Sequence, residues 1–193
     1  MEQTLDSQSF AETIIQPMKI IAFAGSSSSK SINKQLVTYT TTLLDSFEVE
    51  ILDLNDYEMP IFSIDRENIN GIPDKAHAFR EKLAKADGIV CSLAEHNRSY
   101  TVAFKNILDW CSRVDMDIFA NKPMFLMSTS PGGYGGGNVM NAAKSFFPKC
   151  GANIIETFSL PSFKQNFIDG RIANEDMRED HKVKAMAFRE SLP

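Results

Sequence analysis

Three polar segments of the chain hold residue types that could bind an anion or a planar ring. They are residues 25–33, 94–99 and 128–138. The first is rich in serine and precedes a helical pattern. Hydroxyl groups and the unpaired backbone N–H groups at a helix start bind phosphate well, so this segment predicts an anion site. The alternative is a flexible serine loop in which Ser31 or Asn33 only caps the helix.

The second polar segment directly follows an apolar run. Glu95, His96 and Asn97 stand there, where their amides and carbonyls could face a planar heterocycle. The alternative is a turn followed by a helix N-cap at Ser99.

The third polar segment is rich in glycine, because five of the ten glycines of the chain lie in it. Glycine removes side-chain bulk, so that backbone can approach the face of a ligand and the loop can open and close. A merely mobile loop is the alternative.

Several better-known site patterns are missing from the sequence. Because there is neither G-x-x-x-x-G-K-[ST] nor G-x-G-x-x-G, a P-loop or a Rossmann dinucleotide site is not supported. No cysteine opens a C-x-x-x-x-x-R phosphate loop, which excludes the phosphatase of similar architecture. Asp109, Asp115 and Asp117 have no His or Cys at ligand spacing, so we expect no metal site.

Short apolar runs alternate with helical patterns along the chain, and these elements must position the polar segments. Strands are predicted at 18–24, 47–52, 88–93, 123–128 and 152–157, and runs of this kind suit a parallel sheet covered on both faces. Five strands alternating with five helices predict an α/β, doubly wound, flavodoxin-like sheet of strand order 2-1-3-4-5. Ligands of such sheets bind beyond the carboxyl ends of the strands, at the switch point beside strands 1 and 3.

The overall composition is that of an ordinary globular protein with a net charge of −5. This charge argues against a nucleic-acid partner or an anionic membrane surface, and no apolar run is long enough to span a bilayer. Cys91, Cys111 and Cys150 form no C-x-x-C pair and are interpreted as free thiols in a reducing compartment. Residues 1–17 lack basic residues, so we expect a cytoplasmic protein with an N-terminal extension at 1–17 and one domain at 18–193.

The three polar segments, in this order, resemble motifs of the NADPH-dependent FMN reductase family, flavodoxin-like flavoproteins that include quinone, azo-dye and chromate reductases. The motif G-S-x-R-x-x-S-x-N is matched at Gly25, Ser26, Ser31 and Asn33. The motif P-E-Y-N-x-S followed by K-N-x-x-D-W is matched at Glu95, Asn97, Ser99, Lys105, Asn106, Asp109 and Trp110. The motif S-P-G-x-x-G-G is matched at Ser130, Pro131, Gly132, Gly135 and Gly136.

The resemblance implies an enzyme that passes a hydride from NADPH or NADH through bound FMN to a small-molecule acceptor. Such an acceptor is a free flavin, a quinone or an azo compound, and no side chain is obligatory for the hydride step. The resemblance also implies a homodimer or homotetramer. The cofactor-binding residues implied are Ser26, Ser28, Ser31, Ile32 and Asn33 at the phosphate, with Glu95, His96, Asn97, Ser99, Ser130, Pro131, Gly132 and Gly133 around the ring.

The chain departs from the family motifs at three positions. Ser28 stands where Arg is usual, His96 where Tyr is usual, and Ala94 where Pro is usual. Lys30 could partly replace the arginine, although an ammonium lacks the planar fork of a guanidinium. Two alternatives therefore stay open: a non-enzymatic flavodoxin-like electron carrier or flavin-binding module, and a member that has lost FMN.

One long connection, residues 54–73, contains the apolar residues Tyr57, Met59, Ile61 and Phe62. Apolar side chains are costly in a purely solvated loop, so we expect this segment to pack near the flavin or across a dimer interface.

Overall fold

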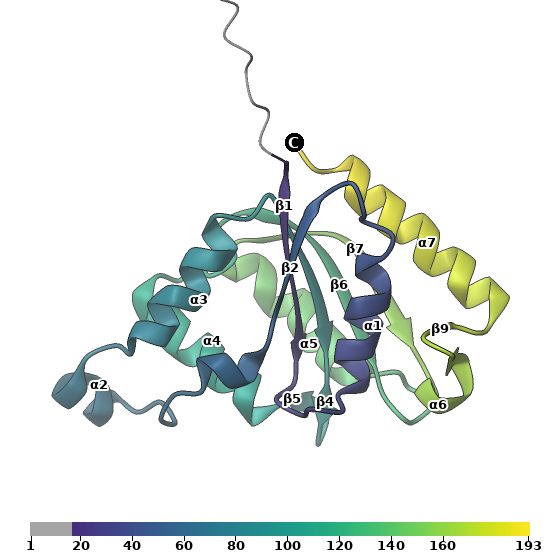
Figure 1. Ribbon diagram of the computed structural model, residues 1–193. Coiled ribbons are helices and arrows are strands. Elements are labelled where there is room, and N and C mark those ends of the chain that lie inside the picture. Colours follow the sequence, from purple (N-terminus) through teal and green to yellow (C-terminus); the bar gives the residue numbers. More distant parts are fainter. Residues whose placement is uncertain (1–16) are drawn as a thin grey trace, which may run out of the picture.

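Five parallel strands form the centre of the computed structural model, which describes residues 17–193 (Figure 1). They are β1 (Lys19–Gly25), β2 (Glu48–Leu52), β3 (Gly88–Leu93), β6 (Lys122–Thr129) and β7 (Ala152–Leu160). Their order, β2-β1-β3-β6-β7, confirms the predicted sheet. The predicted N-terminal extension lies, apart from Pro17, outside the described residues.

Helices cover both faces of this sheet. The helices α3 (Asp74–Ala84), α4 (Val102–Val114) and α5 (Gly137–Phe146) pack on one face, and α1 (Ile32–Thr41) and α7 (Glu175–Glu190) pack on the other. Side chains alternate along a strand, so Ile21 and Phe23 of β1 belong to the first core while Ile20 and Ala22 belong to the second. Within residues 17–193, no helix is both long and apolar enough to cross a bilayer.

Several short elements occur in addition to the five predicted helices. They are the 3₁₀ turns η1 (Leu54–Tyr57) and η2 (Phe147–Cys150), the helices α2 (Ile64–Asn70) and α6 (Phe163–Asn166), and the two-residue strands β4 (Glu95–His96), β5 (Ser99–Tyr100), β8 (Phe167–Ile168) and β9 (Arg171–Ile172). The strands β4 and β5 form one antiparallel hairpin, and β8 and β9 form another.

The long connection 54–73 is anchored to helix α4. The Asn106 side chain donates to the Met59 carbonyl at 3.0 Å and accepts from the Phe62 N–H at 2.8 Å. The Trp110 indole N–H donates to the Pro60 carbonyl at 2.7 Å, and its ring meets Phe62 edge-on at 5.0 Å. Asn106 and Trp110 of the K-N-x-x-D-W motif therefore hold this connection against the chain's own core, which Tyr57 and Met59 also join.

The start of helix α4 differs from the sequence expectation. Of the two candidates for the N-cap of α1, Ser31 is the cap and accepts from the Lys34 N–H. The N-cap of α4, however, is Thr101, so the prediction of Ser99 is wrong. Asn97 and Arg98 have φ values of 50° and 65° and form a tight hairpin turn. Because this turn reverses the chain into strand β5, Ser99 pairs with His96 and helix α4 begins only after β5.

Candidate functional site

The three polar segments meet at the carboxyl edge of the sheet, around a cleft of about 350 Å³. The β1–α1 loop forms one side of the cleft, and the segments after β3 and β6 form the rest. Nine predicted residues line it: Ser26, Ser28, Ser31, Ile32, Asn33, Glu95, His96, Ser130 and Pro131. Lys30, Ala94 and Thr129 complete the lining.

Four of the predicted site residues do not line this cleft. Asn97 and Ser99 lie exposed on the β4–β5 hairpin, and Gly132 and Gly133 lie exposed beyond Pro131. Their part in cofactor binding stays a prediction.

The start of helix α1 offers hydrogen-bond donors to the cleft. Ile32 and Asn33 are its first two residues, so their backbone N–H groups have no acceptor within the helix. The Ser31 hydroxyl accepts from the Lys34 N–H at 3.2 Å and keeps its own proton free to donate. Together with the partial positive charge of the helix start, these groups form an arrangement that suits an anion.

The Asn33 side chain plays a different part from the expected phosphate donor. It is 1% exposed, its Nδ2 donates to the Thr129 carbonyl at 3.2 Å, and its Oδ1 accepts from the Thr129 N–H at 3.0 Å. Oδ1 also accepts from the Ser92 hydroxyl at 2.7 Å. The amide thus ties the β1–α1 loop to the ends of β3 and β6, which leaves the backbone N–H as the group that Asn33 can offer an anion.

The Glu95 carboxylate joins two of the loops that line the cleft. It accepts from the Val139 N–H at 2.9 Å and from the Asn138 side chain at 3.0 Å. Helix α5 begins after Gly136, which provides no side-chain cap. Glu95 therefore caps α5 from a distant part of the chain, a contact that the expected main-chain role did not include.

Removal of the Glu95 cap should loosen α5. We expect Glu95→Ala to lower the free energy of unfolding by about 1–2 kcal/mol, because the helix start loses both its acceptor and a favourable charge. Glu95→Gln retains an acceptor and should lose less than half of that. Urea titrations of the two variants and the unchanged protein test this, and equal losses in both variants would contradict the cap.

The glycine-rich loop has two halves with different constraints. Gly135 and Gly136 have φ values of 61° and 81°, and a Cβ on Gly135 would lie 2.5 Å from the Ser159 hydroxyl. A Cβ on Gly132 or Gly133 would have no neighbour within 4 Å. Gly135 and Gly136 are thus needed for packing, while Gly132 and Gly133 leave open space next to the cleft.

The charges around the β1–α1 loop are unevenly paired. The Lys34 ammonium lies 2.6 Å from the Asp53 carboxylate and, with the Asn55 N–H, lowers the pKa of that carboxyl. Lys30 is exposed and makes no ion pair with any residue of 17–193. Lys30 is therefore the lysine or arginine of the cleft lining that could pair with an anion. Within residues 17–193, no group of three or more His, Cys, Asp or Glu side chains could hold a metal ion.

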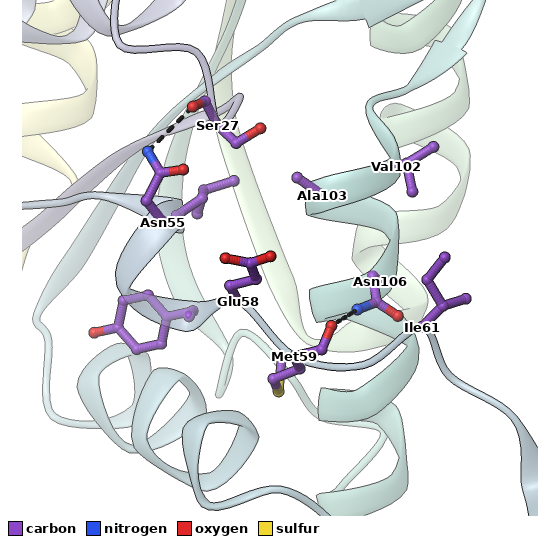
Figure 2. Close-up of a pocket in the computed structure, with 10 residues that line it drawn as sticks. Ser27, Asn55, Glu58, Met59, Ile61, Val102, Ala103 and Asn106 are labelled. Atoms are coloured by element: carbon purple, nitrogen blue, oxygen red, sulfur yellow. Dashed lines mark hydrogen bonds between the residues drawn. The ribbon is translucent and has the colours of Figure 1, made fainter. Parts of the chain in front are cut away.

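A second cavity of about 370 Å³ lies between the 54–61 segment and the first turns of α4 (Figure 2). Ser27 borders it, and Asn55 donates to the Ser27 carbonyl at 3.1 Å. Glu58 projects into the space in front of Ala103. Sequence patterns do not predict this cavity, because it depends on the anchoring of the connection by Asn106.

Solved structures show the same fold. A flavoenzyme NAD(P)H:(acceptor) oxidoreductase from Paracoccus denitrificans superposes with a TM-score of 0.70 at 21% identity, covering 90% of this chain and 96% of that one. An azoreductase from Bacillus anthracis gives a TM-score of 0.59 at 14% identity, covering 90% and 98%.

Curated relatives match in sequence over most of the chain. An NADPH:quinone oxidoreductase of Arabidopsis thaliana is 33% identical over 132 residues, which are 66% of this chain and 65% of that protein. A 2-hydroxy-1,4-benzoquinone reductase of a Burkholderia species is 34% identical over 120 residues, 61% of this chain and 63% of that protein. The match thus spans slightly less than two thirds of these relatives' length.

The family model of NADPH-dependent FMN reductases matches residues 18–165. This range contains all three polar segments and every residue that lines the cleft. The chain therefore belongs to the NADPH-dependent FMN reductase family.

Proposed function

We infer that this chain is an oxidoreductase that holds FMN in the cleft and carries a hydride from NADPH or NADH to a small-molecule acceptor. The observation that carries the inference is the meeting of a donor-rich helix start and an open glycine segment at one edge of the sheet. Similarity to quinone oxidoreductases favours a quinone as the acceptor. A free flavin or an azo compound is the alternative acceptor.

The residues of the cleft fit FMN at both ends. The hydroxyl groups of Ser26 and Ser31, the N–H groups at the start of α1 and the Lys30 ammonium match a phosphate dianion. At the other end, the segments that begin at Ala94 and Ser130 form two walls, between which a planar ring can be held by main-chain groups. The change from the usual Arg to Ser28 removes a charge that Lys30 replaces in part.

The role of the chain in catalysis is to bind, to orient and to keep one ring face open. When bound, FMN supplies the redox chemistry that links a reduced nicotinamide to an acceptor. Glu95 fixes the distance between the two walls by capping α5, while Gly132 and Gly133 leave space for a second ring. Because hydride transfer needs no side-chain acid or base, we assign no catalytic side chain.

An anaerobic reaction of the FMN-loaded protein with NADPH tests the proposed function. Rapid bleaching of the yellow flavin is the expected result. A bound flavin that does not react with either NADPH or NADH would instead support the electron carrier, and a protein that takes up no FMN would contradict both.

Replacement of Ser31 tests the position of the phosphate. Asp and Asn both cap helices about as well as Ser, so Ser31→Asp and Ser31→Asn should leave helix α1 intact. Only Asp places a negative charge beside the phosphate, and we expect it to weaken FMN binding at least about tenfold. Fluorescence titration of FMN measures the affinity, and equal affinities of the two variants would rule out this phosphate site.

An exposed apolar surface supports the further proposal of a homo-oligomer, a dimer or a tetramer. Helix α2 has no buried residue, and Ile61, Ile64, Ile69 and Val102 are 65%, 55%, 78% and 70% exposed. Ile61 and Val102 line the same cavity, and exposed apolar side chains that lie together typically mark an interface. Sedimentation at micromolar concentration should show the oligomer, and a monomer would contradict it.

The three cysteines support the proposal of a cytoplasmic location. Cys91, Cys111 and Cys150 are all buried free thiols, as is common in proteins of reducing compartments. The net charge of −5 supports a small-molecule partner rather than a nucleic acid.

A further inference from the structure

A third cavity, of about 400 Å³, lies along the outer face of helix α1 and has no role in the proposed function. Gln35 and Thr38 of α1 and the C-cap residue Thr42 line one side of it, and the turn of the β8–β9 hairpin at Gly170 lines the other. Figure 1 shows α6 and β9 beside the lower half of α1. The cavity shares Lys30 and Ser31 with the FMN cleft, so the start of α1 is the junction of the two spaces.

Two aromatic rings form the apolar wall of this cavity. Tyr39 and Phe167 line it, with their ring centroids 5.9 Å apart and their planes at 88°. Phe167 is itself stacked on the buried Phe163 at 4.7 Å, which fixes the hairpin in place. Rigid, half-buried aromatic faces are suitable partners for a planar heterocycle.

The polar groups of the cavity are placed between this wall and the phosphate site. The Lys34 charge is neutralised by Asp53 at 2.6 Å, whereas Lys30 has no ion-pair partner within residues 17–193. Thr38 donates its proton to the Lys34 carbonyl and so presents an acceptor, and the Gln35 amide can donate and accept. A ligand of this cavity would therefore meet a cation at the junction, hydrogen-bonding groups in the middle and aromatic rings at the end.

We propose that this cavity binds the adenylate half of FAD while the flavin half lies in the main cleft, so that the protein accepts FAD as well as FMN. FAD is FMN extended from its phosphate by AMP. The extension would begin at the shared residues Lys30 and Ser31 and place the adenine against Tyr39 and Phe167. The proposal rests on the proposed function, because it needs the flavin phosphate at the start of α1.

Equilibrium titrations with FMN, FAD and AMP test the proposal without any turnover. The unchanged protein should bind FAD at least as tightly as FMN. In Thr38→Glu, a carboxylate fills the cavity beside the adenylate, and we expect FAD affinity to fall about tenfold or more while FMN affinity stays within about twofold. Thr41→Glu is the matched control, because it adds the same charge to the same helix at a residue that does not line the cavity.

The outcomes separate this proposal from the proposed function. FMN binding without FAD binding would overturn the adenylate site and leave the FMN site standing, and so would equal losses of FMN and FAD affinity in Thr38→Glu. Binding of neither flavin would overturn both. AMP that binds without weakening the binding of FAD would indicate a separate nucleotide site and would also overturn the proposal.

Discussion

Asn33→Ala should lower the free energy of unfolding by about 3–5 kcal/mol, because it leaves three buried polar groups without partners, each costing about 1–3 kcal/mol. These groups are the N–H and the carbonyl of Thr129 and the hydroxyl of Ser92. The same change should weaken FMN binding, since the amide ties the β1–α1 loop to the two strands that end at the cleft. Urea denaturation and FMN titration measure the two effects.

Asn55→Ala is the matched control for Asn33. Asn55 is exposed, and its side chain bonds the Ser27 carbonyl of the same serine loop. Loss of an exposed hydrogen bond should cost less than about 1 kcal/mol. If Asn33→Ala were no more destabilising than this control, the buried amide would not be what holds the loop in place.

A second large effect is expected at His181, which should make the protein sensitive to acid. The ring is fully buried among Tyr39, Phe125 and Phe158, with Nε2 2.9 Å from the Thr40 hydroxyl. Its Nδ1 has no hydrogen-bond partner within the described residues. Burial lowers the pKa of His181 from 6.5 to about 4, a decrease that Asp180 opposes and Lys184 adds to.

The sign of the pH effect follows from this lowered pKa. Between pH 6.5 and 4 the unfolded chain binds a proton at this site that the folded chain does not, so stability falls as the pH falls. The neutral ring thus contributes stability that is fully present above pH 6.5 and is lost toward pH 4. A decrease of this size corresponds to about 3 kcal/mol.

A substitution isolates this contribution from the carboxylates that titrate in the same range. In His181→Gln, the side chain can still bond the Thr40 hydroxyl but does not titrate. We expect the stability of the unchanged protein relative to this variant to decrease by about 3 kcal/mol from pH 7 to pH 4. His77→Gln is the control variant, because it makes the same substitution at an exposed position of another helix. A constant difference between the unchanged protein and His181→Gln across this range would contradict the argument.

Much of the fold could be predicted because it depends on local patterns. The apolar runs, their alternation with helices and the rule for doubly wound sheets suffice to bring residues 25–33, 94–99 and 128–138 to one edge. The cleft confirms that convergence. Those patterns do not predict the direction in which a single polar side chain points within the folded site.

Asn33 and Glu95 illustrate this limit. Ser92 and Thr129, the partners of Asn33, are 59 and 96 residues away in sequence. Asn138 and Val139, the partners of Glu95, are 43 and 44 residues away. No periodicity or capping rule encodes contacts of that range. His181 differs in part: its spacing to Ala185 and Phe188 places it on the inward side of α7, whereas its contact with Thr40 depends on how α1 packs against α7.

The division of the glycine-rich loop has a consequence for how such proteins diversify. Positions 135 and 136 are confined to glycine by backbone conformation and by their neighbours, so changes there would be removed by selection for folding. Positions 132 and 133 carry no such constraint. Substitutions can therefore accumulate next to the cleft at little cost to stability, and descendants of one scaffold can acquire different acceptors while the packing beneath them stays the same.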